Sequence, residues 1–177
     1  DVNILTSAQA ISTYGSFITR AALPLLAIIG LGINAAEAAA LAAVDLIAGA
    51  VVSQFAGVWI DRLPRKPVLI GTDLLRALLL GTIPLAAAFF GGVTLPHLNA
   101  VSALCGMCAT TFDIAERSYF AGLVNSSALR AVLARTLGIR GAAEFFGFGS
   151  AGLLIGAFGG PAAIGIDALT YIASAVL

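Results

Sequence analysis

The chain has 177 residues, of which 60% are hydrophobic and only 10% are charged, and its mean hydropathy is +1.04. A soluble domain carries about 25% charged residues, so this composition excludes a soluble enzyme, a nucleic-acid-binding protein and a disordered linker. Nine basic and nine acidic side chains balance each other, and lipid is the expected solvent for most of the chain.

Six apolar segments follow one another along the chain. A membrane-spanning helix needs about 20 apolar residues. In chain order, the candidates run over residues 5–33, 38–60, 68–90, 97–120, 128–158 and 162–177. The connections between them are short, so neighbouring helices run antiparallel, and no pattern of period two indicates a strand. We therefore predict an all-α, polytopic membrane protein, and no internal repeat of three plus three helices is apparent.

The basic residues predict the orientation of these helices. They gather at two of the five connections: Arg62, Arg65 and Lys66 after the second segment, and Arg117, Arg130 and Arg135 around the connection after the fourth. The other three connections carry no Lys or Arg. Because cytoplasmic loops are enriched in Lys and Arg, we expect the N-terminus and both basic connections in the cytoplasm. Six spans then place both chain ends on that side.

Two stripes of small residues predict close helix packing. Gly49, Ser53 and Gly57 recur every four residues in the second segment, and Gly152, Gly156 and Gly160 do so from the fifth segment onward. Small residues at this spacing let helix backbones approach in lipid. The contact is either static or a surface along which helices slide.

The connection after the second segment carries an unusual cluster of charges. The stretch from Gly57 to Lys66 reads GVWIDRLPRK and contains Asp61, Arg62 and Arg65 at the end of a spanning helix. A basic anchor at the cytoplasmic surface explains the cations. The acid and the glycine instead indicate a latch that holds one of two conformations, because a carboxylate there can face a helix N-terminus.

This stretch resembles the signature of the major facilitator superfamily, G-x-x-x-D-[RK]-x-[GP]-R-[RK], at every position. Further similar stretches are AQAISTYGS at residues 8–16, DLLR at 73–76 and IDA at 166–168. They resemble the drug:proton antiporter branch that includes macrolide and enterobactin exporters. The resemblance implies an N-terminal six-helix half of a bacterial inner-membrane exporter, with residues 1–177 as one bundle and a C-terminal six-helix half as its partner. Since the sequence begins with Asp1 and ends within an apolar run, we expect it to be part of a longer protein.

The resemblance also assigns partners and marks one departure. It pairs Arg65 with an acid of the fourth helix, Asp113, or alternatively Glu116. Antiporters of this kind carry a G-P-x-x-G motif in the fifth helix, but here Phe148 stands where the proline is expected, between Gly147 and Gly149. The glycines keep the close packing, but the proline bend of the motif is missing.

Four charged residues lie deep in the apolar segments, where an ionisable side chain costs at least about 2.5–3.5 kcal/mol. Counting about 1.5 Å per residue places Arg20 and Asp45 at similar depths, so they can pair either as a titrating cavity pair or as a permanent salt bridge. Arg140 and Glu144 lie four residues apart, as in an intrahelical pair, unless Glu144 is the acid that couples transport to protons. Asp73 and Arg76 are expected to satisfy each other as a structural pair.

The remaining features predict no catalytic, metal or cofactor site. Cys105 and Cys108 have CxxC spacing but lie in an apolar helix, which favours simple packing. His97 is the single histidine, and Tyr14, Phe17, Phe145, Phe146 and Phe148 line either an apolar drug cavity or the lipid-facing and core surfaces. No nucleophile–base pair or phosphate-binding loop occurs, so we do not expect an enzyme.

The predicted function is secondary active transport of amphiphilic small molecules, driven by protons through alternating access. The expected partners are the lipid bilayer, the amphiphilic substrate, protons and the C-terminal half. Two alternatives stay open: a lysophospholipid transporter of the same superfamily, and a non-transporting six-helix scaffold or channel subunit.

Overall fold

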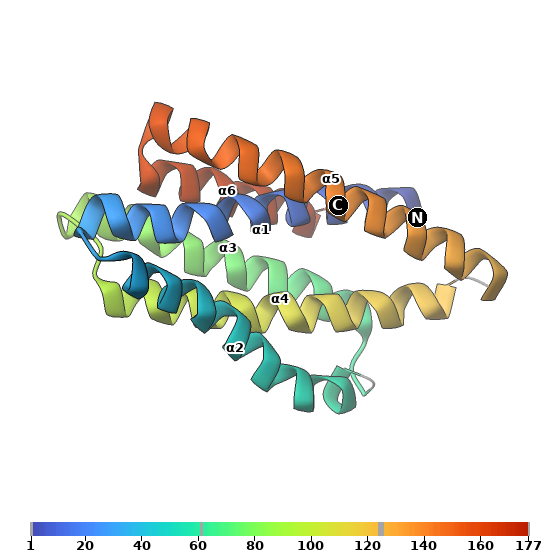
Figure 1. Cartoon of the computed structure of the whole chain (residues 1–177). Helices are drawn as coiled ribbons and strands as arrows, with labels where there is room; N and C mark the ends of the chain where they lie inside the picture. The colour runs from blue at the N-terminus through green and yellow to red at the C-terminus, as the bar shows by residue number, and fades with distance from the viewer. Residues whose placement is uncertain (1, 61, 124–125, 177) are drawn as a thin grey trace.

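A computed structural model describes the backbone of residues 2–60, 62–123 and 126–176, and the side chains of 9–60, 62–122 and 134–176. The described residues form helices and connections, without a strand (Figure 1). The helices are α1 (Val2–Leu31), α2 (Ala35–Ile60), α3 (Arg65–Phe89), α4 (Leu95–Leu123), α5 (Ser126–Phe158) and α6 (Gly160–Val176). The predicted all-α class is confirmed, and the expected segments match these helices to within three residues at each end.

The structure is a polytopic membrane bundle. Five helices, α1 to α5, are long and apolar enough to cross a bilayer. α6 is apolar but has 17 residues, at the lower limit of the usual range of about 17–25. Large apolar side chains stand exposed on the outside of the bundle, among them Phe89, Trp59 and Leu78, which fits a surface that meets lipid tails rather than water.

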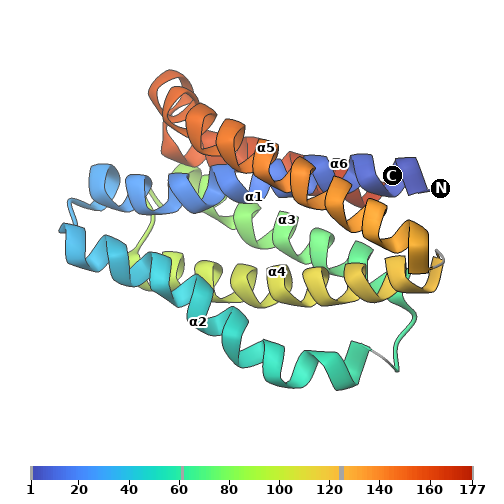
Figure 2. The ribbon, with the colours of Figure 1, turned by 45° about the vertical axis from the view of Figure 1, so that its right-hand side comes forward.

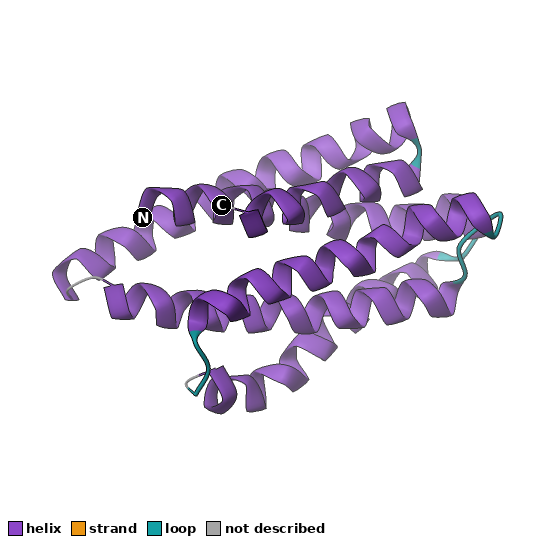
Figure 3. Cartoon of the chain, turned by 180° about the vertical axis from the view of Figure 1, so that it is seen from behind, coloured by secondary structure: helices purple, strands orange, loops and turns teal. Residues whose placement is uncertain are grey.

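The helices run antiparallel and their connections gather at two ends (Figure 3). The α2–α3 and α4–α5 connections lie at the same end as both chain termini, and the other three lie at the opposite end (Figure 1). Arg62, Arg65 and Lys66 therefore belong to the end with the termini. α3 begins at Arg65, so Arg65 and Lys66 stand in its first turn rather than in the expected loop.

At the end of the bundle opposite the termini, specific capping residues end α1 and α5 and begin α2. The Gly32 amide donates to the carbonyl of Ile28 (3.1 Å) with φ +66°, and the Gly159 amide donates to that of Ile155 (2.9 Å) with φ +82°. Glycine adopts this left-handed conformation without steric cost, which closes α1 and α5. Asn34 then opens α2: its Oδ1 accepts from the Glu37 amide (2.9 Å) while Glu37 Oε2 accepts from the Asn34 amide (3.0 Å), which is a reciprocal cap.

The packing has a twofold pattern that the sequence does not display. α2 packs mainly against α4, and α5 mainly against α1, side by side in both views (Figures 1 and 2). α3 packs against α4 and α6, and α6 packs against α3 and α1. Exchanging α1 with α4, α2 with α5 and α3 with α6 maps these pairs onto each other. The contacts of α1 to α3 are therefore repeated by α4 to α6, so that the bundle consists of two related groups of three helices.

Close contacts occur at glycines, but only partly at the predicted stripes. A Cβ on Gly49 of α2 would strike Thr110 of α4, and one on Gly147 of α5 would lie 2.6 Å from the Phe17 Cβ of α1. The expectation of tight packing fails at three positions, since a Cβ on Gly57, Gly152 or Gly156 would meet nothing within 4 Å in the described bundle. The reason is geometric: a stripe at four-residue spacing drifts around the helix, so only part of it faces a given neighbour.

Candidate functional site: a charged pocket among the helices

Two ion pairs connect neighbouring helices within the bundle. Arg20 Nε of α1 lies 3.3 Å from Asp45 Oδ2 of α2, and Arg140 Nη2 of α5 donates to Asp113 Oδ1 of α4 at 2.5 Å. The first pair was expected from the matching depths of its members, and the structure forms it. The two pairs occupy related places, because exchanging α1 with α4 and α2 with α5 maps one helix pair onto the other.

A polar pocket of about 360 Å³ lies between these pairs. It is lined from four helices, α1, α3, α4 and α5, and its charged lining comprises Arg20, Arg76, Asp113, Arg140 and Glu144. Hydroxyls of Ser12 and Ser16 add to the polar wall. Three of the four expected cavity residues, Arg20, Arg140 and Glu144, thus line one pocket. The fourth, Asp45, reaches it through its ion pair with Arg20.

A second, mostly apolar pocket of about 220 Å³ adjoins the first. Arg20 lines both pockets, and Asp45 lines the second together with Leu41 and Phe148. Phe148 contacts Phe17 of the polar pocket with ring centroids 5.4 Å apart. The Arg20–Asp45 pair and these two rings therefore form the boundary between a charged and an apolar compartment.

The expected pairing of Arg65 with Asp113 is not formed in this structure. Asp113 binds Arg140, whereas the Arg65 guanidinium lies near Gly122, 3.3 Å from where a Cβ there would stand. Nine residues of helix, about 14 Å, separate Asp113 from Gly122, so the two positions are too far apart for one side chain to bridge. The alternative acid, Glu116, is buried, and its Oε1 has no hydrogen-bond partner among the described residues.

The expected intrahelical pair of Arg140 and Glu144 is also not formed. Arg140 turns to Asp113 on the neighbouring helix, and the exposed Glu144 has no ion pair within the described part of the chain. The four-residue spacing on α5 indicated Glu144 as a partner of Arg140. It could not indicate Asp113 of α4, because spacing along one helix contains no information about the facing helix.

Two further latch residues are exposed at the end with the termini. Arg62 and Lys66 are exposed, and Gly57 has open space above its Cα. Asp61 lies outside the described residues. Within the described part of this stretch, Arg65 approaches the end of α4, and Ile60 is buried in a cluster with Leu69 and Phe112.

Asp73 and Arg76 belong to a buried network larger than the expected pair. Asp73 Oδ1 accepts a hydrogen bond from Ser12 of α1 (3.1 Å) and Oδ2 accepts one from Ser174 of α6 (2.6 Å). Arg76 Nη1 lies 3.7 Å from Asp73 Oδ1. One carboxylate thus connects α3 to two other helices, and the pair is not self-contained as predicted.

Asp167 of α6 is a second buried carboxyl group, which sequence reasoning noted without assigning it a role. It is completely buried and accepts hydrogen bonds from Thr19 of α1 and from Thr170 (2.9 Å). Gly15 of α1 lies against it, since a Cβ there would strike Asp167 Oδ1 and Thr170 Oγ1. The sequence does show an acidic residue, Asp167, inside an apolar segment. In a membrane such a residue indicates a functional role or a specific partner.

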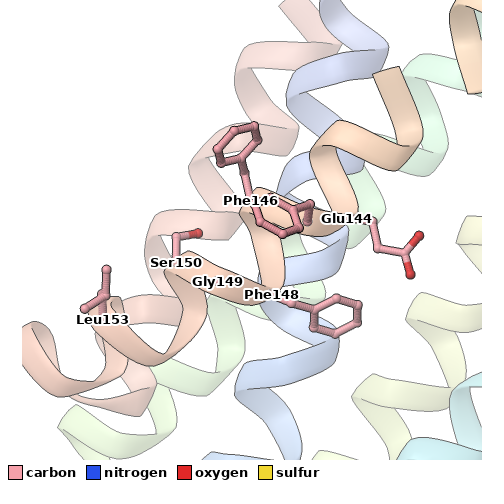
Figure 4. A pocket seen from close by; sticks show the side chains of 7 residues that line it. Glu144, Phe146, Phe148, Gly149, Ser150 and Leu153 are labelled. Atoms are coloured by element: carbon pink, nitrogen blue, oxygen red, sulfur yellow. The ribbon is translucent and has the colours of Figure 1, made fainter. Parts of the chain in front are cut away.

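The aromatic residues of α5 form an exposed apolar surface rather than a closed cavity. Phe145 and Phe146 are 76% and 63% exposed and line a surface hollow of about 600 Å³ with Phe148, Leu153 and Glu144. Figure 4 shows Glu144 and Phe148 projecting to the same side of α5, and Phe146 to another. Tyr14 is not among the residues that line this hollow, but its hydroxyl hydrogen-bonds Ser150, which is one of them, at 2.8 Å. Of the five predicted aromatics, only Phe17 and Phe148 border the two inner pockets.

The described residues hold no cluster of His, Cys, Asp and Glu that would bind a metal. Cys105 and Cys108 are buried free thiols, and His97 Nε2 hydrogen-bonds the Thr82 hydroxyl at 2.8 Å. Comparisons of this chain with protein-family models, with curated proteins and with solved structures give no match.

Proposed function

We propose that this bundle is the N-terminal half of a proton-coupled secondary transporter of the major facilitator superfamily, which exports amphiphilic small molecules across the bacterial inner membrane. A C-terminal six-helix half completes the cavity, and the two halves rock to expose it alternately to each side. The signature turn from Gly57 to Lys66, at the cytoplasmic end, latches the outward-facing form.

The observation that carries this proposal is the charged pocket between apolar helices. The side chains of Arg20, Arg140 and Asp113 are 40%, 32% and 33% exposed at positions inside candidate spans. Charged side chains in a span are costly unless they meet water, a partner charge or a ligand. An open polar pocket lined by spanning helices meets that requirement and provides a place for a substrate.

The packing in two groups of three helices supports the same proposal. Many transporter folds are built from repeated units whose interface holds the binding site. Here the ion pairs Arg20–Asp45 and Asp113–Arg140 stand at related positions of the two groups, on either side of the pocket. Because α2 packs mainly on α4 and α5 mainly on α1, a shift of α2 and α4 against α1 and α5 would change both pairs.

Asp45 is the proposed proton-coupling acid, with Glu144 as the second candidate. Asp45 is 16% exposed, lies at the boundary of the charged and apolar pockets, and holds its partner Arg20 at 3.3 Å. Protonating Asp45 would release Arg20 into the polar pocket. Binding or release of a proton at Asp45 would thereby change the position of Arg20 in the wall of the polar pocket.

Efflux measurements test this function. The protein expressed from its complete reading frame is reconstituted into vesicles, and ethidium movement is followed under an imposed pH gradient. We expect gradient-driven transport by the unaltered protein, and a loss of at least tenfold in Asp45→Asn. Glu37→Gln is the matched control, because glutamine preserves the cap at the exposed start of α2.

Full gradient-driven transport by Asp45→Asn would remove Asp45 from the mechanism and leave Glu144→Gln to be measured in the same way. Folded protein that moves ethidium in neither direction would instead favour a non-transporting scaffold.

A further inference from the structure

Arg76 is the most enclosed cation in the described part of the bundle. Its side chain is 4% exposed, yet it lines the polar pocket from α3. The guanidinium lies over two aromatic rings, 5.4 Å from the centroid of Phe112 and 5.2 Å from that of Tyr171. Aromatic faces attract a cation but accept no strong hydrogen bond, so they leave its N–H groups unoccupied.

The hydrogen-bonding capacity of Arg76 is almost unused. A guanidinium carries five N–H donors. Within the described residues Arg76 donates no hydrogen bond, and its buried Nε has no partner. The nearest carboxylate atom, Asp73 Oδ1, lies 3.7 Å from Nη1, beyond hydrogen-bond distance.

Asp73 does not neutralise Arg76 more closely because its oxygens are engaged elsewhere. Ser12 and Ser174 donate to Oδ1 and Oδ2 at 3.1 Å and 2.6 Å. These two hydroxyls come from α1 and α6 and fix the orientation of the carboxylate. Asp73 therefore supplies a nearby negative charge but not the planar two-point contact that a guanidinium forms best.

The other acids of the pocket leave Arg76 without a substitute partner. Asp113 is bound to Arg140 at 2.5 Å, and Asp45 to Arg20 at 3.3 Å. Glu144 is exposed on α5 and has no ion pair in the described chain. The pocket thus contains three arginines: Arg20 and Arg140 have close carboxylate partners, whereas Arg76 has only the ion pair with Asp73 at 3.7 Å, without a hydrogen bond.

We propose that Arg76 binds an anionic group of the transported molecule, a carboxylate or a phosphate, through two N–H donors of its planar guanidinium. A buried cation without hydrogen-bond partners is costly, and an anionic ligand removes that cost. Phe112 and Tyr171 orient the guanidinium plane, and the apolar pocket beyond Arg20 accepts the apolar body of the ligand. The substrate class is then anionic amphiphiles. This inference rests on the proposed transport function, which does not itself specify the charge of the substrate.

Calorimetric titration of the purified protein in neutral dodecyl maltoside micelles tests the inference without requiring transport. The probes are phenyl phosphate, inorganic phosphate, dodecyl phosphate and the cation benzyltrimethylammonium. We expect phenyl phosphate to bind, Arg76→Gln to weaken it at least tenfold, and Arg76→Lys to weaken it less because the charge remains without the planar fork. Arg117→Gln, an exposed arginine of α4 that does not line the pocket, is the matched control and should leave binding unchanged.

A variant that keeps Arg76 distinguishes a specific loss of anion binding from misfolding of the Arg76 variants. Asp73→Asn removes the competing negative charge and is expected to tighten phenyl phosphate binding severalfold. Binding of inorganic phosphate as tightly as the other anions would identify a free anion as the ligand, whereas a much tighter dodecyl phosphate would identify a lipid-like headgroup.

Anion binding that is insensitive to both Arg76→Gln and Asp73→Asn, or equally weakened by Arg117→Gln, would overturn the inference. So would tighter binding of benzyltrimethylammonium than of phenyl phosphate. Arg76-dependent anion binding by a protein that moves neither ethidium nor an anionic dye such as fluorescein under the pH gradient would leave the inference intact and contradict the proposed function. Ethidium transport without anion binding would support the proposed function and contradict the inference.

Discussion

At the scale of single residues, the molecule is defined by how each intramembrane charge is accommodated. Asp167 has no cation in direct contact among the described residues and accepts hydrogen bonds from the hydroxyls of Thr19 and Thr170. Gly15 makes this arrangement possible, because any side chain at that position would occupy the space of the carboxyl group. The absence of a side chain on α1 thus matters as much as the presence of an acid on α6.

We expect Gly15→Ala to lower stability by about 1–3 kcal/mol, since its Cβ would strike Asp167 and Thr170 and the buried site has no room to relax. The measurement is thermal unfolding in micelles, followed by circular dichroism. Gly30→Ala on the same helix is the control, because its Cβ would meet nothing closer than 3.6 Å. Equal melting temperatures for the two variants would contradict the close contact between α1 and α6.

At the scale of helices, α4 and α5 show what an ion pair contributes where backbones touch little. These two helices are consecutive in sequence but have few contacts, while α5 packs mainly on α1. The Arg140–Asp113 pair at 2.5 Å is their clearest direct connection in the described residues. It therefore determines how far α5 can move from α4.

Either Arg140→Gln or Asp113→Asn is expected to destabilise the bundle by about 1–3 kcal/mol, because the remaining charge loses its partner inside a span. The exchanged double variant, Asp113→Arg with Arg140→Asp, should recover at least half of that loss. Denaturant unfolding in mixed micelles measures both values.

Glu144→Gln provides the matched comparison one helical turn from Arg140. Since Glu144 has no ion pair in the described chain, we expect a change within about 0.5 kcal/mol. A loss as large as that of Asp113→Asn would mean that Arg140 pairs with Glu144 after all, as the spacing on α5 first indicated.

At the scale of the whole molecule, the topology gathers the basic connections and both termini at one end (Figure 1). If that end is cytoplasmic, as the distribution of Lys and Arg predicts, Leu63 faces the cell interior and Thr94 faces outward. Both side chains are exposed in the structure, so their labelling reports the side of the membrane rather than burial.

Labelling with a membrane-impermeant maleimide in intact cells tests this orientation. In a background with Cys105→Ala and Cys108→Ala, we expect Thr94→Cys to react and Leu63→Cys to react only after the cells are opened. The reverse pattern would invert the topology and with it the cytoplasmic placement of the latch.

The sequence determined the features that depend on composition and connection length. The helices, their approximate ends, their antiparallel order and the shared end of the termini all follow from apolar segments separated by short polar turns. The Arg20–Asp45 pair could also be predicted, because the depth of each residue in the membrane can be counted along two consecutive helices from the turn that joins them.

Only the tertiary structure decided which helix faces meet. In lipid both the core face and the outer face of a helix are apolar, so hydrophobic periodicity does not identify the inward side. Phe120 is buried and Phe89 is exposed although both are apolar residues of spanning helices. The partner of Asp113, the glycines that permit close contact and the unsatisfied donors of Arg76 all depend on helix rotation, which interhelical packing fixes and a single sequence does not express.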